Sequence, residues 1–171
     1  MVKRVVDSIL KKANREGKKK AIDIEAIARE YGVVVRAVVI PDDIAGILNR
    51  EEGAGTSILV NECHSRERQR YTVAHQLGHY LCDPGVGIHI DTRTFWGRGS
   101  NESEMERRAN EFARGVLIPE GDIQREWQER VGDGDIVDRE GDIVGDMASH
   151  FGVSVSVIVI RVIELGLIKA G

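Results

Sequence analysis

The amino-acid sequence predicts an α+β fold, in which a small antiparallel sheet packs on a helix and a mostly helical C-terminal part follows. Two observations predict this class. Short runs of β-branched residues separated by turn residues occupy residues 33–61, which is typical of strands. From residue 65 onward the apolar residues recur at helical spacing instead. At 171 residues, the chain is long enough for one domain with its own core, or for one domain and a small appendage.

Composition and charge exclude several classes of protein. Apolar residues make up 42% of the chain and charged residues 30%, which is typical of a globular protein and not of a disordered or fibrous one. The longest apolar run, residues 153–160, is much shorter than a membrane span. The beginning of the chain lacks the apolar segment of a signal peptide, so we expect a cytoplasmic protein. The net charge of −4 disfavours direct binding to nucleic acid.

Two helices and three strands are expected first. Residues 2–13 carry apolar side chains at helical spacing and run into a basic segment, Lys11 to Lys20, which predicts a helix followed by an exposed loop. Asp23 as an N-cap and Gly32 as a stop predict a short second helix. The predicted strands of the antiparallel sheet cover residues 33–40, 44–49 and 57–61.

Two longer helices are expected next. The first runs from Ser65 to a stop at 83–85, and the second begins at Asn101 or Ser103 and ends before Pro119. The residues between them, 84–101, are rich in glycine and predict a long loop over a site. The region 120–146 has ten acidic residues and three basic ones, which favours a mobile acidic loop. We therefore divide the chain into a domain, 1–119, and a C-terminal extension, 120–171.

The end of the chain has two interpretations. The alternating valines and serines of residues 153–160 favour a strand by propensity alone. The spacing of Ala148, Gly152 and Ile158 favours a helix-turn-helix instead, with Ser154 as a cap and Gly166 as a stop. We predict two short helices that pack on the preceding domain. Their second helix offers few polar side chains that would read DNA bases.

The segment His75-Gln76-Leu77-Gly78-His79 places two imidazoles at positions i and i+4, on one face of a helix. This spacing lets both bind a single Zn²⁺ ion. The following helix carries carboxylates that would complete the site. Glu102 and Glu106 lie on the side of its apolar stripe, whereas Glu104 and Glu111 point the other way. Either of the first two is a candidate third ligand.

Two segments, 70–81 and 106–113, together with Leu117-Ile118-Pro119, resemble the ImmA/IrrE family of metallopeptidases. The resemblance implies a zincin-like domain of the gluzincin type, with His75, His79 and Glu106 as zinc ligands and Glu102 as the reserve choice. It also implies a zinc-dependent endopeptidase that cleaves helix-turn-helix repressors of the Xre type, so we expect such a repressor, encoded nearby, as the protein partner. The expected cofactor is Zn²⁺.

Gln76 departs from the pattern of that family, in which a Glu follows the first His and acts as general base. An amide has no proton-accepting pKa in the useful range, so the sequence as written predicts a nearly inactive protease. We interpret Gln76 as an engineered Glu-to-Gln change in an otherwise intact zinc endopeptidase. The alternative is a natural pseudoprotease that binds a repressor stoichiometrically.

Three further features of the sequence could bind a ligand or a metal. His89, in the predicted loop, is expected to be a surface histidine, and the alternative is a contact to substrate or an oxyanion. Cys82 is expected to be a small buried apolar group, and Cys63 and Cys82 are expected to be free thiols, because a helix would separate them by roughly 25 Å. The aspartates of residues 133–138 do not fit a calcium loop and favour a flexible one.

Overall fold

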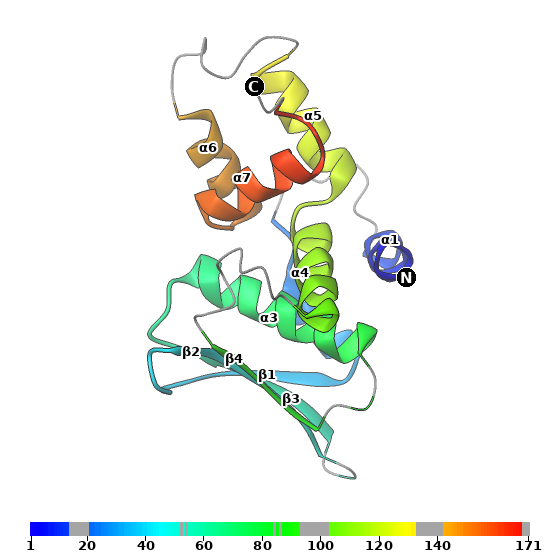
Figure 1. Cartoon of the computed structure of the whole chain (residues 1–171), viewed down its shortest axis with the longest axis vertical. Helices are drawn as coiled ribbons and strands as arrows, with labels where there is room; N and C mark the ends of the chain where they lie inside the picture. The colour runs from blue at the N-terminus through cyan, green and yellow to red at the C-terminus, as the bar shows by residue number, and fades with distance from the viewer. Residues whose placement is uncertain are drawn as a thin grey trace.

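The computed structural model describes residues 1–13, 21–51, 53, 55–83, 85, 87–92, 103–132 and 142–168. Figure 1 shows a sheet at one end of the molecule and helices above one of its faces. The helices are α1 (Val2–Lys12), α2 (Ile24–Glu30), α3 (Arg66–Cys82), α4 (Glu104–Leu117), α5 (Glu120–Arg130), α6 (Ile143–Phe151) and α7 (Val155–Glu164). The strands are β1 (Val33–Val38), β2 (Ile44–Glu51), β3 (Gly55–Asn61) and β4 (Ile88–Thr92). The predicted α+β class is confirmed.

The sheet is mixed, with strand order β1-β3-β2-β4. Strand β2 pairs antiparallel with β3 and with β4, as expected of an antiparallel sheet, but β1 pairs parallel with β3. The reason is that the β2–β3 hairpin returns between β1 and β2, so β3 runs in the direction of β1. Strand β4 lies within residues 84–101, which the glycine content predicted to be a loop, and its pairing with β2 makes it a strand.

Helix α3 is buried because the sheet covers one side and α4 covers another. Nine consecutive residues of this helix, 71–79, are buried, although their sequence is polar and its apolar residues form only a weak stripe. Gly78 allows the close approach of α4, because a Cβ at this position would lie 3.0 Å from the Cα atom of Ala109. The polar motif of the sequence therefore lies inside the protein and not on its surface.

Side chains at the helix ends explain where three helices begin. Asp23 accepts a hydrogen bond from the Ala26 amide, as predicted for the start of α2. Ser65 and Ser103 accept hydrogen bonds from amides in the first turns of α3 and α4. Of the two N-caps considered for α4, Ser103 is the one observed, and Asn101 lies outside the described residues. The first turn of α4 is thereby held in position, and Glu106 belongs to that turn.

The C-terminal part is helical where it is described. Two short helices, α6 and α7, meet at 99°, and Gly152 between them adopts a left-handed conformation with φ 63°. The strand interpretation of residues 153–160 is wrong. The expectation of a mobile loop is also wrong for residues 120–130, which form α5, and for residues 143–146, which begin α6. Residues 133–141 lie outside the described part. The basic loop predicted around residues 14–20 lies outside it too.

No single helix in the described ranges is long and apolar enough to cross a membrane, and α6 and α7 pass that test only as a bent pair.

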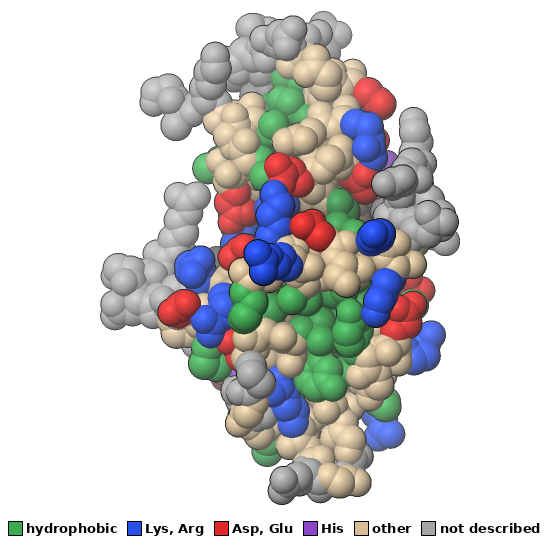
Figure 2. Space-filling model, turned by 90° about the vertical axis from the view of Figure 1, so that its right-hand side faces the viewer, with side chains coloured by type: hydrophobic (Ala, Val, Ile, Leu, Met, Phe, Trp, Pro, Cys, Tyr) green, Lys and Arg blue, Asp and Glu red, His purple; other side chains and the backbone are tan. Residues whose placement is uncertain are grey.

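Figure 2 shows one face of the molecule, on which acidic and basic side chains lie interspersed around a central group of hydrophobic ones. Charge on this face is therefore mixed.

Candidate metal centre

Helices α3 and α4 bring three of the predicted site residues together in the interior. His75 and His79 are one turn apart on α3, and their Nε2 atoms are 3.2 Å apart. Glu106 reaches both from α4. Its Oε2 atom lies 3.2 Å from His75 Nε2, and its Oε1 atom lies 3.3 Å from His79 Nε2. All three residues are buried. Glu102, the reserve choice, lies outside the described residues.

His89 joins this group from the edge strand β4. Its Nε2 atom lies 3.3 Å from Glu106 Oε1, and its ring centroid lies 3.8 Å from that of His79. One donor atom from each of the four residues, His75, His79, His89 and Glu106, lies within 4.8 Å of the others. The expectation of a surface histidine is wrong, because only 15% of the His89 side chain is exposed.

A signal in the sequence would have found His89. The run 88–91 alternates apolar and polar side chains, Ile-His-Ile-Asp, and a strand sends alternate residues to opposite faces. A strand here would place His89 and Asp91 on one face and the two isoleucines on the other. The glycines around this run favour a loop instead and obscure the alternation of so short a strand.

The pKa shifts of Glu106 and His79 suit a metal ion. Burial by itself would raise the pKa of Glu106, but its contacts with the three imidazoles outweigh burial and hold that pKa below its ordinary value. Burial lowers the pKa of His79, which favours the neutral ring. A charged carboxylate and neutral imidazoles are the forms that bind a metal. Glu106 Oε2 and His89 Nε2 are buried and, among the described residues, make polar contacts only within this group and no well-aligned hydrogen bond, which fits a role as ligands.

A chain of hydrogen bonds orients His75 from behind. Its Nδ1 atom lies 3.1 Å from Asn110 Oδ1, and because this oxygen only accepts, Nδ1 is the donor. The lone pair of His75 is therefore on Nε2, which faces the other three residues. The Tyr71 hydroxyl also donates to Asn110 Oδ1 at 3.0 Å, Arg114 donates to that hydroxyl at 3.4 Å, and Arg114 pairs with Glu164 of α7 at 2.6 Å.

His79 is held at the end of α3. Its Nδ1 atom lies 3.4 Å from Asp83 Oδ2, and Arg108 donates to the other carboxylate oxygen of Asp83. Arg50 of β2 donates to the backbone oxygen of His79 at 2.7 Å. His75 and His79 thus both have positioning partners of the kind that tune metal ligands in proteins.

Gln76 lies on the buried side of α3 that faces the sheet. Its amide donates to the backbone oxygen of Gly46 in β2 at 3.5 Å, and its Oε1 atom has no hydrogen-bond partner among the described residues. Such a side chain holds or orients a polar group, but it does not accept a proton at neutral pH. Gly46 makes room here, since a Cβ at that position would lie 2.5 Å from the Thr72 methyl group.

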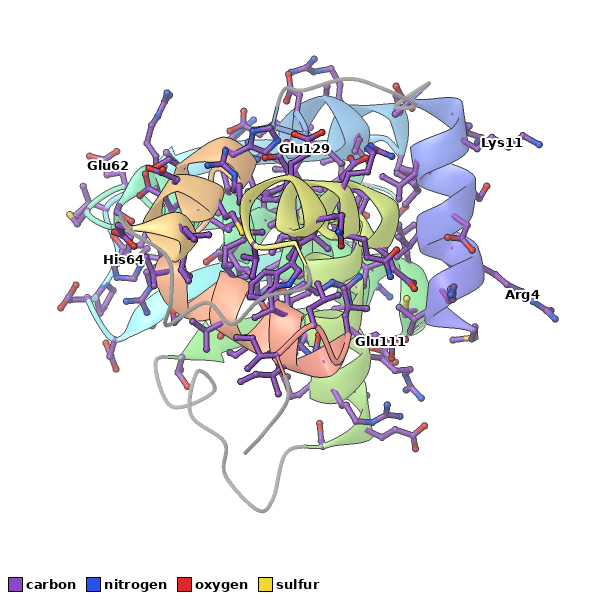
Figure 3. All side chains as sticks on the ribbon, turned by 90° about the horizontal axis from the view of Figure 1, so that it is seen from above. Arg4, Lys11, Glu62, His64, Glu111 and Glu129 are labelled. Carbon is purple, nitrogen blue, oxygen red and sulfur yellow. The ribbon has the colours of Figure 1, made fainter. Side chains whose placement is uncertain are left out.

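The other candidates lie apart from the group. Both cysteines are free, Cys63 exposed and Cys82 buried, and burial raises the pKa of the Cys82 thiol. Glu111, labelled in Figure 3, pairs with Arg107 on α4 instead of joining the imidazoles. The aspartates of residues 133–138 lie outside the described residues. Within the described ranges, the four residues named above form the one group that fits a metal ion.

Comparison with known proteins agrees with this geometry. The family model described as IrrE N-terminal-like domain, Peptidase_M78, matches residues 28–162, which include all four residues of the group. No curated protein matches the chain. The match extends through α3, β4 and α4 to α7 and covers more than three quarters of the chain. The chain therefore belongs to the Peptidase_M78 family of IrrE N-terminal-like, metallopeptidase-type domains.

Proposed function

We propose that this chain is a zinc-dependent endopeptidase scaffold whose target is a helix-turn-helix repressor of the Xre type, encoded near its gene. The observation that carries the proposal is the buried group formed by His75, His79 and Glu106. Imidazole nitrogen and carboxylate oxygen are ligands that Zn²⁺ takes in catalytic sites. When bound, the ion supplies a Lewis acid that polarises a carbonyl and acidifies water. Because such repressors act on cellular DNA, the cytoplasm is the proposed location.

The side chain at position 76 determines whether this chain hydrolyses a bound target or only binds it. A glutamate at this position would accept a proton from water, whereas the amide only donates or accepts hydrogen bonds. We propose that the chain as written binds its target and leaves it intact. General-base assistance is worth on the order of 10² to 10⁴ in rate, so the loss is large enough to measure.

The substitution Gln76→Glu tests the proposal, because it exchanges an amide for a carboxylate of nearly the same volume. Each form is loaded with one equivalent of zinc and incubated with the neighbouring repressor, and intact and cleaved repressor are measured by mass spectrometry. The Glu form should cleave the repressor on the order of 10² to 10⁴ times faster than the Gln form, and a chelator should abolish the cleavage.

Two variants on α4 serve as a matched pair. Both are made together with Gln76→Glu, because only that form is expected to cleave. Glu106→Gln removes a proposed ligand and should lower both zinc content and cleavage, whereas Glu111→Gln changes a partly exposed carboxylate that pairs with Arg107 and should change neither. If the zinc-loaded Glu form leaves the repressor whole, the protease proposal is refuted.

A second function is favoured by Gln76 itself. A natural pseudoprotease that sequesters a repressor would keep the metal site and the binding surface but need no general base. The residue encoded at position 76 of the natural gene discriminates the two functions, since a glutamine there favours sequestration. Tight one-to-one binding of the repressor without cleavage by the Glu form would support it in the assay above.

A further inference from the structure

We propose that His89 of β4 is a fourth protein ligand, which closes the coordination shell of the metal as long as no target is bound. This inference rests on the proposed function, in which His75, His79 and Glu106 hold the ion. Catalytic zinc sites have three protein ligands and an open position, whereas closed sites with four protein ligands hold their metal structurally. The number of protein ligands therefore determines whether the metal in the free protein has an open coordination position.

The position of His89 follows from the register of the sheet. Strand β4 pairs with β2 so that His89 lies opposite Leu48, and side chains of directly opposed residues lie on the same face of a sheet. Leu48 is fully buried in the core. The alternation of β4 agrees, because Asp91 is 2% exposed, whereas Ile88 and Ile90 on the opposite face are 65% and 48% exposed. The backbone pairing directs His89 to the inner face, independently of the side-chain rotamer.

The contacts of His89 are contacts to other proposed ligands. Its Nε2 atom lies 3.3 Å from Glu106 Oε1, and its ring lies against the ring of His79. Among the described residues that buried nitrogen makes no well-aligned hydrogen bond, and its polar contact is the Glu106 carboxylate itself. A buried polar atom without a hydrogen bond is costly, and a metal ion shared with His75, His79 and Glu106 would satisfy it.

Three nitrogens and one carboxylate oxygen make a complete tetrahedral set for Zn²⁺. With this set in place, the free protein has no coordination position for water. This closure comes from β4 and applies to the free protein, whereas the missing general base of α3 also applies when a target is bound. A chain with both features keeps its metal in the absence of a target.

The test compares metal binding in the full chain and in two variants, His89→Ala and His64→Ala. His64 is the matched control, because it lies at the edge of the molecule opposite α1 in Figure 3 and its ring approaches Asp42 instead of the site. Affinity for Zn²⁺ is measured by competition with a chromophoric chelator. The visible absorption spectrum of the Co²⁺ form is recorded with and without azide, which binds only where a coordination position is open.

The expected results separate the closed site from an open one. His89→Ala should bind Zn²⁺ at least about 10- to 100-fold more weakly, since loss of even a positioning partner of a ligand costs that much, and His64→Ala should match the unchanged chain. Azide should alter the Co²⁺ spectrum of His89→Ala only. If His89→Ala does not fold, His89→Gln is measured in the same way, because it keeps a polar side chain without the imidazole.

Two other outcomes overturn different claims. If the unchanged chain binds one metal ion, azide alters its spectrum and His89→Ala binds equally well, then His89 is not a ligand and only this inference fails. If the folded chain binds no metal at all, the proposed function fails as well.

Discussion

The substitution Gly78→Ala tests whether the close contact of α3 and α4 builds the metal site. Gly78 lies between the two imidazoles of the motif. A Cβ at this position would lie 3.0 Å from both the Cα and the backbone oxygen of Ala109, and 3.2 Å from the Cβ of Phe112. These are atoms of the helix backbone or directly attached to it, so no side-chain rotation removes the overlap. The two helices must move apart.

Two opposing contributions determine how far Gly78→Ala changes the free energy of unfolding. Alanine in a helix interior is about 1 kcal/mol more favourable than glycine, whereas overpacking a well-packed core costs about 1–3 kcal/mol. The net change in the free energy of unfolding is a loss of up to about 2 kcal/mol, which corresponds to a lower Tm by up to about 4–8 °C for a chain of this size. Glu106 is one turn before Ala109 on α4, so its carboxylate moves away from the imidazoles and zinc affinity falls.

Gly115→Ala is the matched control, because Gly115 also lies within a helix, α4, and gains the same propensity. The atoms nearest to its Cβ would be those of the Val6 side chain, at 3.3 and 3.4 Å, and Val6 belongs to α1, which carries none of the proposed ligands. Thermal unfolding with a chelator and zinc affinity are measured for both variants. The reasoning is refuted if Gly78→Ala is as stable as Gly115→Ala and binds zinc as tightly as the unchanged chain.

Two further predictions concern the hydrogen-bond chain behind His75. Asn110→Ala removes the acceptor that orients this imidazole, so zinc affinity should fall about 10- to 100-fold; an unchanged affinity in chelator competition would show that Asn110 does not position the ligand. Burial raises the pKa of Tyr71 to about 12, above its unfolded value of about 10. The stability that the protonated hydroxyl contributes is therefore complete below about pH 10 and is lost as the pH rises through about 12, up to about 2.7 kcal/mol for two units. In urea unfolding, the difference in stability between the unchanged chain and Tyr71→Phe should shift in favour of the variant over this range, and a constant difference would contradict the assignment.

The elements that depend on neighbouring residues were predictable from the sequence, whereas strand pairings such as that of β4 with β2 were not. Helix α3 and its two imidazoles were predictable, because positions i and i+4 share a face in any α-helix. The choice of Glu106 over Glu102 needed the family resemblance, since helical geometry placed both on the same side. The first sheet strands were predictable from β-branched runs, but their order was not, because the position of β3 between β1 and β2 depends on pairing across the whole sheet.

The sequence by itself determined most of the local elements, the two histidines one helical turn apart and the glutamine between them, because these depend on residues within one or two helical turns. Only the tertiary structure decided that β4 is a strand and that His89 lies beside Glu106. The physical reason is that strand pairing joins residues about forty positions apart in the chain, such as Leu48 and His89. The alternation of residues 88–91 indicates which face His89 takes once a strand forms, but the energy that forms the strand comes from hydrogen bonds to β2 and burial against α3, which lie far from His89 in sequence.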